Sequence, residues 1–151
     1  MNNDNSNFVE LARLPIVKMQ DVLMARFIGR NEAGKMGFPP AVLTRLATAI
    51  SEITRNVVQH AGAPGEFQLG RVSAGDQTGL RIIVSDHGQG IAHPEQFLDE
   101  GKFGPLGAGL AGTRRLVDEF HLESSPGAGT TVTLEFWIGR PATPAGKPLG
   151  A

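Results

Sequence analysis

The segment LTRLATAISEITRNVVQH, residues 43–60, has the most regular helical pattern in the chain. Its apolar side chains recur at three- and four-residue spacing, at Leu43, Leu46, Ile50, Ile53 and Val57. This spacing is the period of an α-helix that buries one face in a core. The segment therefore predicts a long amphipathic helix, which Gly62 and Pro64 should end.

A column of three polar residues runs beside the apolar stripe of this helix. Glu52, Asn56 and His60 follow one another at four-residue spacing, so their side chains should stack on the same side. A carboxylate and an amide one turn apart suit a proton acceptor and an oxygen ligand for a hard cation such as Mg²⁺. A solvated helix face would produce the same letters, so the assignment depends on motifs elsewhere in the chain.

Composition places the chain among ordinary globular proteins. The 151 residues suit one domain, and 40% hydrophobic with 19% charged residues argues against wholesale disorder. The net charge of −1 gives no basic footprint for nucleic acid, and the lack of cysteine excludes disulfides, thiolate metal sites and a cysteine nucleophile. No apolar run approaches the roughly 20 residues of a membrane span, and the first residues lack the layout of a signal peptide. We expect a soluble, cytoplasmic protein that contacts neither membrane nor nucleic acid.

Shorter periodic segments surround the long helix. A strand at residues 8–14 should lead into a first helix, which Pro15 opens and Gly34 and Gly37 end. The apolar stripe of this first helix is expected at Ile16, Met19, Leu23 and Phe27. Further strands are expected at 66–73, 80–85, 121–125 and 130–138, with a helix at 107–120. The resulting β-α-α-β-β-loop-α-β-β order predicts an α+β sandwich with helices on one face of a mixed sheet.

Two glycine-rich motifs follow the strand at 80–85. Asp86-x-Gly88-x-Gly90 places a carboxylate at the strand end, where it can accept a hydrogen bond from an exocyclic amine and so favour adenine. Its glycines would let a flat base lie against the backbone, although ordinary turns and cation-binding loops carry the same letters. The second motif, GAGLAG at 107–112, opens the helix at 107–120, and a helix start is a natural phosphate site.

The GAGLAG motif also spells the dinucleotide fingerprint G-x-G-x-x-G, but its context is wrong for that reading. No strand precedes it, and it lies late in the chain rather than in a first βαβ unit. Close helix–sheet packing is an alternative role for Gly112. A last motif, Gly127-x-Gly129-Thr130, turns into the final strand and could bring the Thr130 hydroxyl to the same pocket as Asp86.

These four motifs, in this order and spacing, resemble the GHKL family of ATP-binding domains over roughly residues 8–138. Glu52-x-x-x-Asn56 is similar to the N box of that family, and the three glycine motifs are similar to its glycine boxes. The resemblance implies the Bergerat, histidine-kinase-like fold: a two-layer sandwich with a mostly antiparallel sheet. It also implies a mobile ATP lid at Ala92–Leu106, while the Pro- and Gly-rich residues 139–151 should form a disordered tail.

The resemblance implies ATP and Mg²⁺ as ligands and assigns a role to particular residues. Glu52 would be the catalytic base, Asn56 the Mg²⁺ ligand and Asp86 the adenine anchor. The remaining nucleotide contacts would come from Gly88, Gly90, Ile91, Gly107, Gly109, Leu110, Ala111 and Thr130. Two positions depart from the family pattern: Ala108 replaces a larger apolar residue and His60 replaces an aromatic residue.

Within the family, ATAISEITRNVVQHAG and the residues from Gly109 to Trp137 look most like the RsbT-type switch kinases. That likeness implies a serine/threonine kinase that phosphorylates a STAS-domain protein and then binds another partner, such as a PP2C-type phosphatase or a sigma factor. A module that uses ATP only to sequester its partner is the alternative. A stand-alone histidine-kinase ATPase domain fits less well, because no histidine begins a phosphoacceptor motif.

Histidine and arginine residues complete the candidates. The four histidines have no metal-ligand spacing, so we expect them to be structural or to face solvent. Arg114 and Arg115 follow the second glycine box closely enough for one to touch a phosphate, although a solvated arginine is the simpler explanation.

Overall fold

A computed structural model of the chain describes residues 7–91 and 105–139. In chain order the elements are β1 (Val9–Ile16), α1 (Met19–Met36), α2 (Pro40–Asn56), a π-helical turn (Val57–Ala61), β2 (Gly65–Ala74), β3 (Gln77–Asp86), α3 (Pro105–Arg114), β4 (Glu119–Ser125) and β5 (Gly129–Trp137). This is the order that the sequence predicts. The expected lid lies outside the described residues except for its last two positions, which begin α3, and so does the expected tail beyond residue 139.

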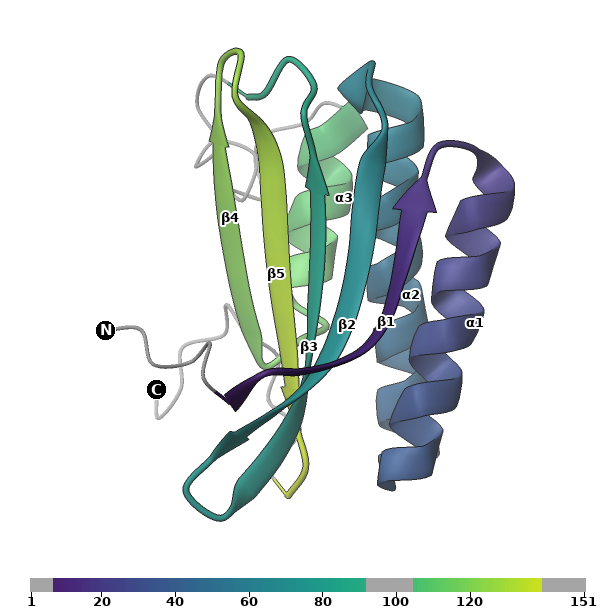
Figure 1. Ribbon diagram of the computed structural model, residues 1–151, viewed down its shortest axis with the longest axis vertical. Coiled ribbons are helices and arrows are strands. Elements are labelled where there is room, and N and C mark those ends of the chain that lie inside the picture. The colour runs from purple at the N-terminus through teal and green to yellow at the C-terminus, as the bar shows by residue number, and fades with distance from the viewer. Residues whose placement is uncertain (1–6, 92–104, 140–151) are drawn as a thin grey trace.

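The five strands form one sheet in the order β1-β2-β3-β5-β4, and each neighbouring pair is antiparallel. The three helices lie together on one face of this sheet (Figure 1). The prediction of an α+β sandwich is therefore confirmed, but the sheet is antiparallel rather than mixed. Its connections explain the difference, since hairpins join β2 to β3 and β4 to β5, and α3 carries the chain from β3 to the far edge at β4.

The core lies between the sheet and α2. Leu46, Ile50 and Ile53 of α2 are almost completely buried, as the period of residues 43–60 predicts. They belong to one cluster with strand residues such as Leu69 and Ile82. Burying each large aliphatic side chain stabilises the fold by about 1.5–3 kcal/mol, so this stripe fixes α2 against the sheet.

The first helix begins later than the sequence predicts. Pro15 lies in β1 opposite Glu66 of β2, not at a helix start. An edge strand tolerates proline because one of its sides has no ladder of hydrogen bonds to lose. The helix instead begins at Met19, where the Asp21 carboxylate accepts hydrogen bonds from the backbone N–H groups of Val17 and Lys18 at 2.9 and 3.0 Å.

The apolar stripe predicted for α1 is also wrong. Ile16 is buried, but in β1, while the side chains of Met19, Leu23 and Phe27 are exposed. The helix buries its small residues instead, at Val22, Ala25, Gly29 and Ala33. Gly29 explains the choice, because a Cβ added there would collide with Cδ1 of Ile50. Helix α1 therefore approaches α2 closely through a face that has no room for large side chains.

Helix α3 is shorter than the predicted helix at 107–120, since it ends at Arg114. A tight turn follows, in which Leu116 N–H donates to the Thr113 carbonyl at 2.9 Å. Phe120, expected on the helix, belongs to β4 and pairs with Leu134 of β5. Pairing with β5 thus overrides the helical period of these residues.

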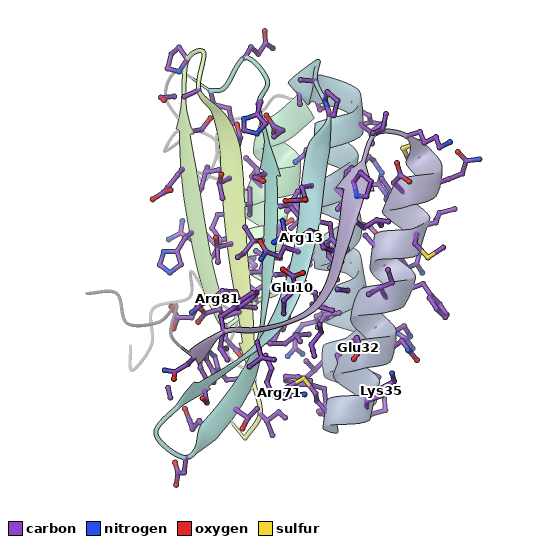
Figure 2. All side chains as sticks on the ribbon, viewed as in Figure 1. Glu10, Arg13, Glu32, Lys35, Arg71 and Arg81 are labelled. Carbon is purple, nitrogen blue, oxygen red and sulfur yellow. The ribbon has the colours of Figure 1, made fainter. Side chains whose placement is uncertain are left out.

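The open face of the sheet carries charged side chains. Arg13 binds Glu10 of its own strand and Glu66 of β2, and Arg81 pairs with Glu135 at 2.7 Å where both are nearly buried. Figure 2 shows Glu10, Arg13 and Arg81 in front of the sheet, away from the helices. Within residues 7–91 and 105–139, no helix has both the length and the apolar character that a bilayer span requires.

Candidate functional site

A pocket of about 250 Å³ lies where the C-terminal end of α2 faces the ends of β3 and β5. Apolar side chains from five elements form most of its wall, at Ile53, Val57, Val84, Leu110 and Val132. Its polar groups come from Asn56, His60, Asp86, Gln89 and Thr130. An apolar cavity with a few convergent polar groups is the usual form of a small-molecule site.

The end of α2 changes its winding beside this pocket. The helix gives way to the π-helical turn, which stops at Gly62 with a φ of 73°. Such turns insert a residue into the helical ladder and occur often at functional sites. Here the turn contributes His60 and Ala61 to the pocket wall. His60 is therefore partly exposed in the pocket wall, and His87 and His121 are exposed to solvent.

Asp86 is the last residue of β3, and its carboxylate lines the pocket. One oxygen, Oδ1, accepts a hydrogen bond from the Gly88 backbone N–H at 2.8 Å. In the described part of the chain, the second oxygen has no hydrogen-bond partner. The Asx turn therefore fixes the carboxylate while leaving Oδ2 as an acceptor for a ligand donor.

The two glycines after Asp86 allow close backbone packing around the pocket. A Cβ at Gly88 would collide with the Ala61 carbonyl, and one at Gly90 would collide with the Ser125 carbonyl. Gly90 also has a φ of 78°, which few other residues adopt. These glycines let the loop pack against the π-helical turn and the end of β4, and Gly90 lines the pocket as well.

The second glycine motif meets the N-box pair. A Cβ added at Gly109 of α3 would lie 3.0 Å from Oε1 of Glu52 and 3.7 Å from Nδ2 of Asn56. The glycine therefore allows α3 to pass directly over the polar column of α2. Glu52 and Asn56 share the side of α2 that the four-residue spacing predicts.

Asn56 has a buried side-chain amide whose hydrogen-bonding capacity is not satisfied. Its Nδ2 atom is buried without a hydrogen-bond partner, and no other side-chain nitrogen or oxygen in the described residues is in that position. Leaving such a group unpaired costs about 1–3 kcal/mol, which a bound ligand would offset. The oxygen and nitrogen of an amide can exchange places, so either atom can meet the ligand. This requirement fits a Mg²⁺–nucleotide, because the amide can offer oxygen to the cation or N–H to a phosphate oxygen.

Sequence reasoning missed Ser124, which joins three parts of the site. Its Oγ accepts from the Ile91 backbone N–H at 2.8 Å, donates to the Gly129 carbonyl at 3.1 Å and lies 2.7 Å from Oγ1 of Thr130. Either hydroxyl can be the donor in the last bond. In both cases the Thr130 oxygen keeps a lone pair that can accept from a ligand. Nothing in the sequence around Ser124 indicates this role.

Sequence reasoning also missed Arg55, which binds the proposed base. Its Nη1 atom lies 2.7 Å from Oε2 of Glu52, and about a third of each side chain is exposed, 34% and 35%. A pair three residues apart on a helix is a recognisable pattern, so this contact could have been found from spacing. Oε1 of Glu52 still faces Gly109.

The remaining predicted site residues divide into two groups. Ile91, Leu110 and Thr130 line the pocket. Ala111 is buried but is not part of the pocket wall, and Gly107 lies in the first half of α3.

Comparisons with known proteins agree with this geometry. Residues 19–136 match the family model of the histidine kinase-like ATPase domain. The chain is 40% identical over 120 residues to the serine/threonine-protein kinase RsbT of Bacillus subtilis (strain 168), covering 78% of this chain and 90% of RsbT. It is 33% identical over 99 residues to the anti-sigma F factor of Pasteuria penetrans, covering 61% of this chain and 66% of that protein.

A solved structure has the same fold. The RsbU and RsbW domains of Rv1364c from Mycobacterium tuberculosis align with a TM-score of 0.57 at 23% identity, covering 88% of this chain and 34% of that longer chain. The match of the family model over most of the chain, together with the RsbT likeness, confirms the resemblance drawn from the four motifs. The chain belongs to the histidine kinase-like ATPase domain family, the GHKL group of ATP-binding domains.

Proposed function

We propose that this protein is an ATP- and Mg²⁺-dependent serine/threonine kinase that phosphorylates a STAS-domain protein in a partner-switching pathway. Asn56 and Asp86 line the pocket, and Glu52 lies one helical turn before Asn56, next to Gly109 of α3. This arrangement supports the proposal. The orphaned amide of Asn56 is the observation that carries it, because a buried unpaired donor indicates a polar ligand in contact with the N box.

Each polar group has a separate task in this proposal. Asp86 accepts a hydrogen bond from the adenine amine on its unpaired oxygen, and Thr130 accepts a second one or holds a water. Asn56 would hold Mg²⁺ through its amide oxygen. Bound Mg²⁺–ATP supplies the phosphoryl group and the positive charge that screens it. Glu52 takes the proton of the serine or threonine hydroxyl of the protein substrate.

An ATP-dependent sequestering module is the second candidate, and one contact favours it. Oε2 of Glu52 is already bound by Arg55, so the carboxylate has only Oε1 free to approach a hydroxyl. The likeness to an anti-sigma factor is consistent with such a role. The kinase proposal requires either that Oε1 accepts the proton or that Arg55 moves when the substrate binds.

Transfer of labelled phosphate separates the two candidates. The purified chain is incubated with γ-labelled ATP, Mg²⁺ and candidate STAS-domain proteins, and label is followed on serine and threonine. The kinase proposal expects stoichiometric labelling of one STAS protein that depends on Mg²⁺. Stable, ATP-dependent binding of a partner without label would support the sequestering module instead.

A further inference from the structure

Helix α1 presents large apolar side chains to solvent. Met19, Leu23, Met24 and Phe27 are 44%, 60%, 49% and 65% exposed, and all four lie within nine consecutive residues. At about 100° per residue, Met19, Leu23 and Phe27 form one stripe along the helix. Clustered apolar exposure of this kind marks an interaction site rather than a random surface. We call these four residues, with Arg26 and Arg30, the outer α1 surface.

The fold itself does not need these side chains. Helix α1 attaches to α2 through Val22, Ala25, Gly29 and Ala33, on the opposite side of the helix. The small residues of that contact are required by the close approach of Ile50 to Gly29. An apolar stripe that stabilises nothing within the described residues is explained by a partner that covers it.

The outer α1 surface continues into a groove between α1 and α2. The groove has a volume of about 550 Å³ and is lined by Phe27, Arg30, Asn31, Gly34, Lys35 and Leu43. Gly34 is exposed, so its missing side chain leaves the groove open beside Phe27. A stripe at four-residue spacing next to a shallow groove has the shape that receives an amphipathic helix.

Charge indicates which helix fits. Arg26 and Arg30 border the stripe, and in the described residues neither forms an ion pair. The nearby acids are already engaged, because Asp21 caps the helix and Glu32 binds Lys35 at 3.3 Å. Two copies of this chain meeting face to face would bring four unpaired arginines together, which disfavours a symmetric dimer through this surface.

We propose that the outer α1 surface binds an amphipathic helix of a partner protein whose apolar face is bordered by acidic residues. This inference goes beyond the proposed function, since neither ATP binding nor phosphoryl transfer requires this surface. In Figure 1, α1 lies at the β1 side of the sheet, whereas α3 and the pocket wall at β5 lie towards the other side. The partner helix and the nucleotide can therefore bind at the same time.

Two synthetic peptides test the proposal by NMR titration of the isotopically labelled full chain. Both are helix-forming, with leucines at positions i, i+4 and i+7, and their flanking positions are all glutamate in one and all lysine in the other. We expect the glutamate peptide to shift amide signals of residues 19–36 and to bind about tenfold more tightly than the lysine peptide at low salt. Leu23→Ser with Phe27→Ser should abolish this binding, while Arg26→Glu combined with Arg30→Glu should reverse the preference between peptides.

Val9→Ser is the matched control, because Val9 is 54% exposed but lies on β1. It should leave peptide binding unchanged. Binding of neither peptide, equal binding of both, or signal shifts confined to residues away from α1 and Leu43 would overturn the proposal. So would a dimer of the free chain in sedimentation that Phe27→Ser dissociates, since the occupant would then be a second copy. ATP affinity is measured on the same samples. If the wild-type chain binds the glutamate peptide but not ATP, the result contradicts the proposed function and leaves this inference intact.

Discussion

Helices α1 and α2 pack against each other, yet they use the same apolar period in opposite ways. Helix α2 buries its large residues, such as Ile50 and Ile53, whereas α1 buries small residues and exposes Leu23 and Phe27. The spacing of apolar residues therefore shows that a segment is helical, but not which of its faces meets the core. Shape decides that question, because Ile50 leaves room only for glycine at position 29.

Each of the two helices also carries an ion pair of its own, and the two pairs differ in their surroundings. Glu52 binds Arg55 on α2, and Glu32 binds Lys35 on α1, in both cases three residues apart. Figure 2 shows Glu32 and Lys35 on α1. Only the α2 glutamate faces the second glycine motif and the N-box asparagine. The proposed role of Glu52 therefore depends on its place next to Asn56 and Gly109, not on its ion pair.

The largest effect should come from removing that glutamate. Glu52→Ala should lower the rate of phosphoryl transfer to the partner by about 10²–10⁴-fold, because a general base is lost. Affinity for Mg²⁺–ATP should remain close to that of the wild type, since Asn56 and Asp86 are intact. Glu32→Ala is the control and should leave the transfer rate unchanged. Near wild-type transfer by Glu52→Ala would contradict the assignment of the base and favour the sequestering module.

Truncating one large residue on each helix tests whether α2 buries its large side chains while α1 exposes them. Ile50→Ala should reduce the free energy of unfolding by about 2–5 kcal/mol, because it opens a cavity in the core. Leu23→Ala should change it by less than about 0.5 kcal/mol, as expected for an exposed side chain. Denaturant unfolding measures both. Equal losses would mean that the outer α1 surface is part of the core.

Adding one methyl group to each of two α1 glycines is a finer test. Gly34→Ala should stabilise the chain by up to about 1 kcal/mol, since the new Cβ would be 4.0 Å from Leu43 and alanine favours a helix. Gly29→Ala should destabilise it by about 1–2 kcal/mol, because Ile50 must move out of a packed position. Thermal unfolding of both variants shows whether each substitution raises or lowers the stability of the fold. Stabilisation by Gly29→Ala would show that α1 and α2 are not closely packed there.

The smallest effect concerns the start of α1. Hydrogen bonds from the Val17 and Lys18 backbone N–H groups hold the pKa of Asp21 below its usual value. A carboxylate with a lowered folded-state pKa stabilises the fold above its unfolded-state pKa, near 3.8, and loses this effect as pH falls through the folded-state pKa. Asp21→Ala should therefore cost about 0.5–1 kcal/mol near pH 7 and less near pH 2. Asp76→Ala, in the exposed turn between β2 and β3, is the control and should leave the free energy of unfolding at pH 7 almost unchanged.

Much of the fold was predictable because its signals are local. The period of residues 43–60, the turn between β2 and β3 and the apolar residues of β5 each define an element without reference to the rest of the chain. The predictions for the start of α1 and the end of α3 were wrong because the signals that decide them are not local. Strand pairing holds Pro15 in β1 and Phe120 in β4, and pairing depends on residues distant in sequence.

The candidate site shows the same division. Motif order predicted that Asn56, Asp86, Leu110 and Thr130 meet, and the pocket brings them together. The contacts of Ser124 and the true neighbours of Gly88 and Gly90 could not be read from spacing, because they arise where β4 and the π-helical turn converge. The four-residue spacing did place His60 beside Asn56, and both line the pocket, but it did not indicate the π-helical turn that carries His60.

Calorimetric titration with Mg²⁺–ATP of the wild type and of Asp86→Asn tests the central claim most directly. The variant replaces an oxygen acceptor with an amide, which costs about 2–3 kcal/mol and should weaken binding tens- to a hundredfold. His87→Asn, at the exposed neighbouring position, should bind like the wild type. This result would identify the pocket beside Asp86 as the ATP site. Unchanged affinity in a folded Asp86→Asn protein would contradict it and place the nucleotide elsewhere.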